Sequence, residues 1–323
     1  MTTHRGKLVT VFGGSGFIGR HTVRALARHG WRVRVAVRRP DLAGHLQPLG
    51  TVGQIMPVQA NLRYRWSIDR AVEDADAVVN LVGILNEGGR QTFGAVQAFG
   101  AHAVAEATRA AGIEHLVHVS AIGADKASPV AYARTKAEGE ARVLETVPGA
   151  VVLRPSIVFG PEDRFFNRFA EMALASPVLP LIGGGHTKLQ PVFVGDVAEA
   201  IARSVSGAVA GGRAYELGGP EVKSFRACME LLLAEIERSR ALMPLPFGLA
   251  RALASVLQIL PGAPLTVDQV RLLEVDNIVS DAARQDGRTL EGVGIVPTSM
   301  SAVLPSYLVR FKPHGQFEHK RSS

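Results

Sequence analysis

Cysteine is almost absent from this chain of 323 residues, which contains Cys228 alone. A single cysteine can form neither an internal disulfide nor a multi-cysteine metal site, so a reducing compartment fits best. Aromatic residues make up 6%, and they are not interleaved with the basic residues, which argues against nucleic-acid binding. The histidines are scattered, and His186 has no second ligand at metal-binding spacing, so we expect no metal site.

Long uninterrupted apolar runs are also missing. The longest apolar region, 241–265, is broken by four prolines and by Arg251. Its helical part, 246–260, would be about 22 Å long, short of the roughly 30 Å hydrocarbon layer of a membrane. We expect this helix to pack in a core rather than to form a docking surface. The residues before Lys7 contain no apolar stretch, and we therefore expect no secretory signal.

Acidic residues are outnumbered, with 29 Asp and Glu against 36 Lys and Arg and a net charge of +7. The clearest basic run is the tail after Arg310. A solvated surface with a frayed terminus is the favoured interpretation, while a face for an acidic partner or for anionic lipid headgroups stays open. Hydrophobic residues make up 47%, which is typical of a globular chain rather than a disordered one.

The most informative stretch present is 9–20, with the sequence VTVFGGSGFIGR. A β-branched apolar run leads into glycines at 13, 16 and 19, and a helical pattern follows. Such a strand, loop and helix can place free N–H groups and a close backbone approach around a pyrophosphate. We therefore expect a Rossmann-type doubly wound parallel sheet that binds a dinucleotide.

Arg38 follows the second expected strand, at the place where a dinucleotide fold meets the adenosine ribose. An acidic residue there selects NAD, whereas a guanidinium accommodates the 2′-phosphate of NADP, so NADPH is favoured over NAD(H). Asn61 follows the third strand, and it could contact adenine or simply cap the next helix.

Ser120 ends the fifth expected strand, 115–120, and Tyr132 and Lys136 lie four residues apart on the helix that follows. An ammonium beside a phenol would lower the pKa of the phenol, as acid/base work near neutral pH requires. A solvated surface pair explains such spacing equally well when it is taken alone. Its place after a serine-bearing strand and a glycine loop favours a functional pair.

These motifs together resemble the extended or atypical short-chain dehydrogenase/reductase superfamily. In family order come the glycine loop, Asn80-Leu81-Val82-Gly83, Ser120, Tyr132 and Lys136, followed by 154–161 and 190–198. The resemblance implies that Ser120, Tyr132 and Lys136 form the catalytic set. It also implies a cofactor site made of Gly13, Ser15, Gly16, Phe17, Ile18, Gly19, Arg38, Asn61, Leu62, Leu81, Val82, Gly83, Tyr132, Lys136, Pro155, Ile157 and Val158.

Within that superfamily the chain most resembles the nucleotide-binding accessory subunits of respiratory complex I and their bacterial relatives. The segments that carry this resemblance are 82–86, 164–169, 265–273, 276–277 and 304–307. The resemblance implies tightly held NADPH with a structural or assembly role and complex I subunits as partners. It also implies a cytoplasmic protein, peripheral on the inner membrane when bound to the complex. The alternative is an active NAD(P)-dependent oxidoreductase or epimerase, with ubiquinone biosynthesis as one setting.

Two departures from the family pattern bear on catalysis. The segment 97–101, QAFGA, stands where the extended branch has N-V-x-G-T, so the asparagine credited with holding a catalytic water is replaced by Gln97. Glutamine could hold the same water from one methylene further out. Asn61 stands where many relatives have aspartate. For domains, we expect a nucleotide-binding domain over 1–160, returning around 186–218, and a mostly helical lobe over 161–323.

Overall fold

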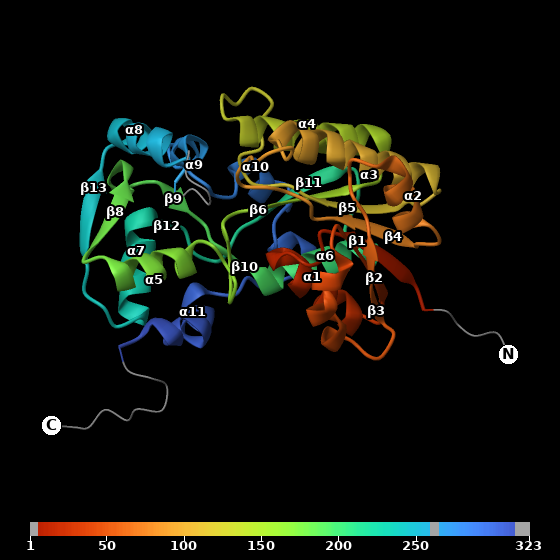
Figure 1. Cartoon of the computed structure of the whole chain (residues 1–323), viewed down its shortest axis with the longest axis horizontal. Helices are drawn as coiled ribbons and strands as arrows, with labels where there is room; N and C mark the ends of the chain where they lie inside the picture. The colour runs from red at the N-terminus through yellow and green to blue at the C-terminus, as the bar shows by residue number, and fades with distance from the viewer. Residues whose placement is uncertain (1–5, 259–264, 314–323) are drawn as a thin grey trace. The chain divides into compact units, whose positions relative to one another are not determined.

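The computed structural model describes residues 6–258 and 265–313, and the chain divides into two compact units (Figure 1). The first unit contains the described residues up to Pro155 together with Val194–Leu217 and Val279–Val296. The second contains Ser156–Phe193, Gly218–Ile278 and the described residues from Pro297 onward. The predicted helix end at 260 and the basic tail from 314 lie outside the described residues.

The first unit is built on a seven-stranded parallel sheet with the order β11-β6-β5-β4-β1-β2-β3. Its β-branched runs are buried along their length, as strands covered on both faces require. The strands are β1 (Leu8–Phe12), β2 (Arg32–Val37), β3 (Ile55–Gln59), β4 (Ala77–Asn80), β5 (His115–Val119), β6 (Val151–Pro155) and β11 (Arg213–Leu217).

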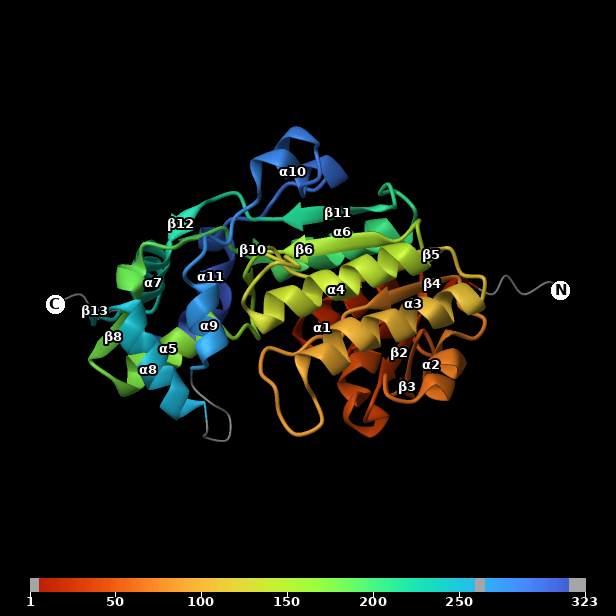
Figure 2. The same ribbon diagram turned by 90° about the horizontal axis from the view of Figure 1, so that it is seen from above.

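Helices cover both faces of this sheet. One face carries α1 and α6, which pack against each other, and the other carries α2, α3 and α4, with α3 beside α4 (Figures 1 and 2). A π-helix, η3, leads directly into α3. The bounds are α1 (Phe17–Arg28), α2 (Arg65–Val72), η3 (Gly94–Phe99), α3 (Gly100–Ala110), α4 (Ala131–Thr146), α6 (Val194–Val205) and α10 (Asp281–Gln285).

Strand β11 forms one edge of the sheet, and a later segment of the chain covers it. The N–H of Glu216 donates to the carbonyl of Arg288 (2.9 Å), and the Arg288 guanidinium donates to the carbonyl of Ala214 (2.9 Å). Arg203 on α6 anchors the same segment by donating to the carbonyls of Val293 and Gly294. The edge is therefore not open to pairing with another chain.

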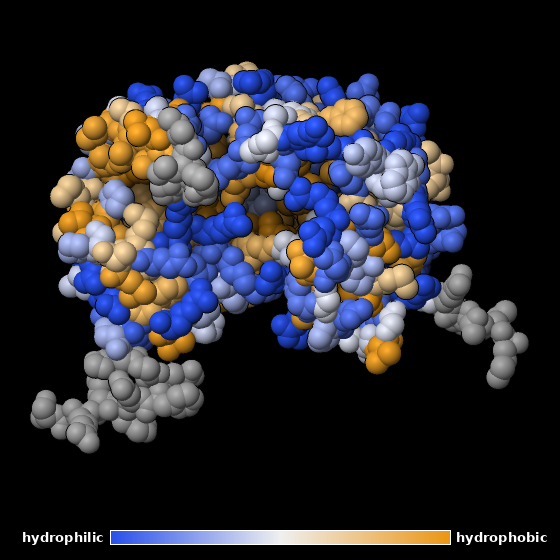
Figure 3. Space-filling view, viewed as in Figure 1, coloured by the Kyte–Doolittle hydropathy of each residue, from blue (hydrophilic) through white to orange (hydrophobic). Residues whose placement is uncertain are grey.

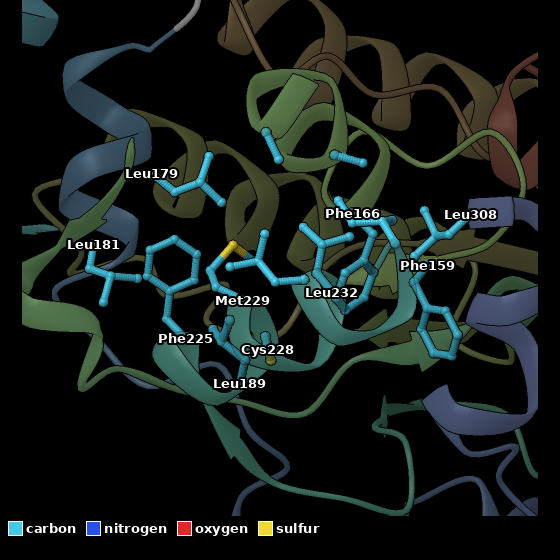
Figure 4. Packing of buried hydrophobic residues seen from close by; sticks show 14 of the residues in the cluster. Phe159, Phe166, Leu179, Leu181, Leu189, Phe225, Cys228, Met229, Leu232 and Leu308 are labelled. Carbon is cyan, nitrogen blue, oxygen red and sulfur yellow. The ribbon is translucent and has the colours of Figure 1, made fainter. Parts of the chain in front are cut away.

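The second unit packs around an apolar and aromatic core. Its centre includes Phe166 from α5, Leu181 from β8, and Phe225, Met229 and Leu232 from α7 (Figure 4). The helices are α5 (Phe166–Ala175), α7 (Phe225–Glu235), α8 (Phe247–Leu257), α9 (Val267–Leu272) and α11 (Met300–Leu308). The short strands are β7 (Val158–Phe159), β8 (Val178–Ile182), β9 (Lys188–Leu189), β10 (Val192–Phe193), β12 (Lys223–Ser224) and β13 (Ala241–Leu245).

The burial of helix α8 differs from our expectation. We expected its apolar side chains to lie in a core, but Leu249, Leu253 and Val256 are 60%, 45% and 66% exposed. The small residues Ala250 and Ala254 are the ones that are buried. Apolar side chains gather on this part of the surface, over α8 and β13 (Figure 3). Periodicity alone could not show which side of an apolar helix faces inward.

The expected fold class is confirmed: a Rossmann-type parallel sheet with flanking helices and a smaller, mostly helical C-terminal part. The domain bounds differ in detail from those expected. The first stretch of the first unit ends at Pro155 rather than at residue 160. The first unit also contains Val279–Val296, a segment that we expected in the second lobe.

Candidate functional site

The carboxyl ends of β1 and β4 meet where the strand order reverses. All strands are parallel, but the later strands are added to the sheet on opposite sides of this pair: β2 and β3 lie beside β1, and β5 and β6 lie beside β4. Open α/β sheets bind ligands at such a switch point. The loops after both strands are in contact here, because a Cβ added to Gly13 would lie 3.3 Å from the backbone of Leu81 and Val82.

The glycine loop after β1 is closely packed. A Cβ on Gly19 would lie 2.4 Å from the carbonyl oxygen of Gly13, and one on Gly14 would lie 2.8 Å from Val35. Gly13 has a φ of +79°, which L side chains rarely adopt. Gly13 and Gly19 therefore set the turn and the approach of α1, and Gly14 packs against Val35 of β2, a contact that the sequence analysis did not foresee.

The N-terminus of α1 offers free N–H groups. Gly16 is its N-cap, with no side-chain cap, and the first turn carries no acidic residue. Ser15, Phe17 and Ile18 are half-buried beside it. Unsatisfied N–H groups and the positive end of the helix dipole suit a phosphate group.

The two arginines after β2 differ in their contacts. Arg39 is held by Asp41, with its Nη2 2.7 Å from a carboxylate oxygen. Arg38 is exposed and makes no hydrogen bond or ion pair with any residue that the structure describes. Of the pair, Arg38 is thus the guanidinium available to a phosphate, which is the residue that we had selected.

Asn61 makes hydrogen bonds to residues close to it in the sequence. Its side-chain oxygen accepts a hydrogen bond from the N–H of Arg63 (3.2 Å), and its N–H donates to the hydroxyl of Ser67 (3.0 Å). These hydrogen bonds shape the turn before α2. Asn61 does not cap that helix, as the local alternative had it, because the N-cap is Tyr64 and no side chain caps it. Leu62, the next residue, packs against the core of the first unit.

Lys136 is buried at 6% exposure, and its ammonium donates to the carbonyl of Val119 (3.1 Å) at the end of β5. A Cβ on Gly83 would lie 3.3 Å from Lys136 Nζ. The ammonium therefore lies beside the loop after β4. Burial lowers the pKa of Lys136 to about 8, although the nearby Glu140 carboxylate acts in the opposite direction.

The pKa of Tyr132 differs from our expectation. We expected the neighbouring ammonium to lower the pKa of the phenol, but burial raises the pKa of Tyr132 to about 12. The ring of Tyr132 packs edge-on against Phe93, with centroids 5.8 Å apart. Near neutral pH Tyr132 is therefore a neutral hydroxyl. Ser120 is 4% exposed, and its buried hydroxyl has no hydrogen-bond partner among the described residues.

The amide of Gln97 contacts protein groups at both of its ends. Its nitrogen donates to the carbonyl of Ile84 (2.8 Å), and its oxygen accepts from the hydroxyl of Thr135 (2.9 Å). Two protein groups thus occupy the side chain that could have held a water in the place of the family asparagine.

A buried histidine was missed by the sequence analysis. The Asn80 amide nitrogen lies 3.3 Å from His118 Nδ1, and Asn80 Oδ1 accepts from the N–H of Val82 (3.1 Å). Burial, followed by the charge of Lys136, lowers the pKa of His118 to about 3, so the ring is neutral. The signal was a histidine inside an apolar strand, two residues before Ser120.

The remaining predicted residues lie near the unit boundary. Pro155 ends β6 in the first unit, whereas Ile157 and Val158 belong to the second. There the N–H of Ile157 donates to Asn277 Oδ1 (3.2 Å), and Val158 pairs with Val192. Asn277 also accepts from the hydroxyl of Ser156 (2.6 Å), so it fixes this segment from far along the chain.

Two searches of the described residues gave negative results. Across 6–258 and 265–313, no group of three or more His, Cys, Asp or Glu side chains is arranged to hold a metal ion. Over the same ranges, none of the helices combines the length and the apolar character needed to cross a bilayer.

The sequence of this chain matches a protein family and is similar to several known proteins. Residues 9–218 match the model of the NAD dependent epimerase/dehydratase family. The chain is 33% identical to NADH dehydrogenase (ubiquinone) 1 alpha subcomplex subunit 9, mitochondrial, of Arabidopsis thaliana, over 96% of this chain and 79% of that protein. It is 35% identical to a ceramide reductase of Caulobacter vibrioides, over 56% of each chain.

Solved structures show the same fold. The NADPH-dependent quinone oxidoreductase of Escherichia coli, crystallised with NADPH, superposes with a TM-score of 0.71 at 21% identity. The match covers 94% of this chain and 99% of that one.

Proposed function

This chain belongs to the NAD-dependent epimerase/dehydratase family, and we propose that it holds NADPH as an accessory or assembly subunit of respiratory complex I. The observation that carries the proposal is its 33% identity, over 96% of its length, to a relative named as a subunit of NADH dehydrogenase. Family membership makes a nicotinamide nucleotide the cofactor class. The choice of NADPH rests on Arg38.

The residues at the switch point fit such a cofactor. The cradle formed by Gly13 and Gly19, which a Cβ would fill, suits a pyrophosphate at the start of α1. Arg38 would pair with the 2′-phosphate, and Lys136 would donate to the hydroxyls of the nicotinamide-side ribose. When bound, NADPH supplies a hydride donor.

Two features support a mainly structural role for the cofactor. The pKa of Tyr132 is raised to about 12, which disfavours a phenolate acting as a general base, while its neutral hydroxyl can still donate a hydrogen bond or a proton. Gln97 gives both ends of its amide to protein groups. Tyr132 and Lys136 would then be retained because they bind the cofactor.

The proposed location is the cytoplasmic face of the inner membrane, with complex I subunits as partners and contact with the membrane surface as a further element. The exposed apolar side chains of α8 support contact with a partner, which would cover them.

Blue-native electrophoresis of solubilised membranes, probed for this chain, tests the proposal. We expect the chain to migrate with complex I, and we expect NADPH to raise the melting temperature of the purified protein without being consumed. Migration solely as a small soluble species would count against the accessory role.

The second candidate is an active NADP-dependent oxidoreductase or epimerase, with ubiquinone biosynthesis as one setting. It is supported by the presence of Ser120, Tyr132 and Lys136 together and by the similarity to a ceramide reductase. Under this alternative the purified protein would turn over a carbonyl compound or sugar nucleotide, and Tyr132→Phe would abolish that turnover.

A further inference from the structure

Gln97 lies in an unusual turn. The segment Gly94–Phe99 is a π-helix that continues into α3, and such turns are rare and occur frequently at functional sites. Gln97 is only 2% exposed. A long polar side chain has thus been turned into the interior of the first unit, where each of its polar groups needs a partner.

The two partners of Gln97 belong to segments of the candidate site. Ile84 directly follows Gly83 in the loop after β4, and Thr135 directly precedes Lys136 on α4. The orientation of the amide is fixed, because the Ile84 carbonyl can only accept a hydrogen bond. The amide nitrogen must face Ile84, and the amide oxygen then faces the Thr135 hydroxyl, whose single proton is shared between this oxygen (2.9 Å) and the carbonyl of Ala131 (2.8 Å).

The backbone around Gln97 is also fixed by close packing. A Cβ on Gly139 of α4 would lie 2.3 Å from the carbonyl oxygen of Gln97. A Cβ on Gly100 would lie 2.9 Å from the side chain of Leu62. The π-helix is therefore packed against α4, and the start of α3 is packed against the segment after β3.

The loop after β4 is held at its other end as well. Asn80 accepts from the N–H of Val82, and its amide nitrogen is held by His118. Segment 81–84 is thus pinned by Asn80 at its start and by Gln97 at its end. The Gln97 pin is the one that reaches α4.

We propose that Gln97 is a positioning residue for the nicotinamide side of the cofactor. Its amide holds the loop of Leu81, Val82 and Gly83 at a fixed spacing from Tyr132 and Lys136, so that both segments are ready to receive the cofactor. This inference rests on the proposed binding of NADPH. Its consequence is kinetic: the bridge slows the departure of bound cofactor, since the loop cannot open away from α4.

The test compares two glutamines. Gln97→Leu removes the bridge, and Gln54→Leu is the matched control, because Gln54 Nε2 donates to the carbonyls of Ala27 (2.8 Å) and Trp31 (3.0 Å) at the opposite ends of the strands. Both variants lose buried hydrogen bonds, and both should melt at a lower temperature. NADPH dissociation is followed by the loss of bound-cofactor fluorescence after excess NADP⁺ is added to displace it.

We expect Gln97→Leu to speed NADPH dissociation by about tenfold and Gln54→Leu to leave it within about twofold. Hydrogen exchange should rise in 81–86 for Gln97→Leu, while β1 and α1 stay protected. Gln97→Glu keeps the acceptor for Thr135 and loses the donor to Ile84, so it should also speed dissociation, and it serves if the leucine variant fails to fold.

The outcomes separate this inference from the proposed function. Equal acceleration in both glutamine variants, or unchanged dissociation in the Gln97 variants, would overturn the positioning role while leaving NADPH binding intact. Failure of the unaltered protein to bind NADPH would overturn the proposed function, and the inference with it.

Discussion

The two units of this chain differ in the polar and apolar side chains that they bury. The first unit takes polar side chains into its interior, where Asn80, His118, Gln97 and Lys136 lie around the ends of β4 and β5. The second unit has a large apolar and aromatic core, with large apolar side chains on its surface along α8, and its buried polar side chains include the linked group of Asp163, Asn167 and Tyr307. Buried polar groups cost free energy unless each is paired, and in the first unit they gather at the strand ends that form the candidate site.

The largest effect should come from a glycine in the first unit. Gly19→Ala places a Cβ 2.4 Å from the carbonyl oxygen of Gly13, and no side chain is there to move aside. We expect about 4 kcal/mol of destabilisation or more, with loss of NADPH binding. Thermal unfolding and cofactor titration measure both.

A glycine of the second unit supplies the contrast. Gly248 lies in α8 with nothing within 4 Å of an added Cβ. Gly248→Ala should therefore stabilise the protein by about 0.5–1 kcal/mol through helix propensity. Similar effects of the two substitutions would contradict the difference in packing between these two positions.

Core truncation in the second unit should separate stability from binding. Leu232 is fully buried in the cluster of Figure 4, and Leu232→Ala should cost about 3 kcal/mol through the lost contacts and the cavity. NADPH affinity, measured by calorimetry well below the melting temperature, should stay within about twofold. A large loss of affinity with the fold intact would show that the second unit contributes strongly to cofactor binding.

Replacement of Arg38 should change the cofactor preference without changing stability. Arg38→Asp removes the guanidinium proposed for the 2′-phosphate, and we expect NADPH to bind about 10- to 100-fold more weakly. NADH should be affected far less. Arg39→Asp is a useful comparison, because Arg39 is already held by Asp41. Equal losses for both cofactors would contradict the role given to Arg38.

The affinity for NADPH should fall as the pH rises through about 8. The pKa of Lys136 is lowered to about 8, and its ammonium form donates stronger hydrogen bonds to ribose hydroxyls than the neutral amine does. The dissociation constant should rise by up to about tenfold per pH unit above that value. Lys136→Met should bind more weakly and lose this dependence, whereas a flat profile in the unaltered protein would argue against contact between Lys136 and the cofactor.

Tyr132→Phe should have the smallest effect. If Tyr132 mainly positions the cofactor, its loss should leave NADPH affinity within about tenfold, or some 1.4 kcal/mol, and preserve assembly of the host complex. Lys136→Ala should weaken binding more. A carbonyl substrate whose turnover depends on Tyr132 would show instead that the pair is catalytic.

The sequence carried the local part of this structure well. The glycine loop, α4 and most strands of the sheet follow from patterns within short windows, and the order of the motifs pointed to the fold. Long-range contacts were not readable in this way. Nothing in 279–296 indicates that it returns to cover β11, and the outward side of α8 depends on what packs beneath it. The raised pKa of Tyr132 likewise depends on burial by distant residues.

The return of Val279–Val296 to the first unit also constrains the order in which the protein can be made. All seven strands have left the ribosome once Leu217 has emerged, yet the edge of β11 then lacks its cover from Arg288. Of the second unit, Ser156–Phe193 is made before β11, and Gly218–Ile278 must be synthesised before the covering segment emerges. A fragment ending near residue 218 would thus carry an uncovered strand edge, the kind that recruits other chains, so the family-matched region is a poor choice for separate expression.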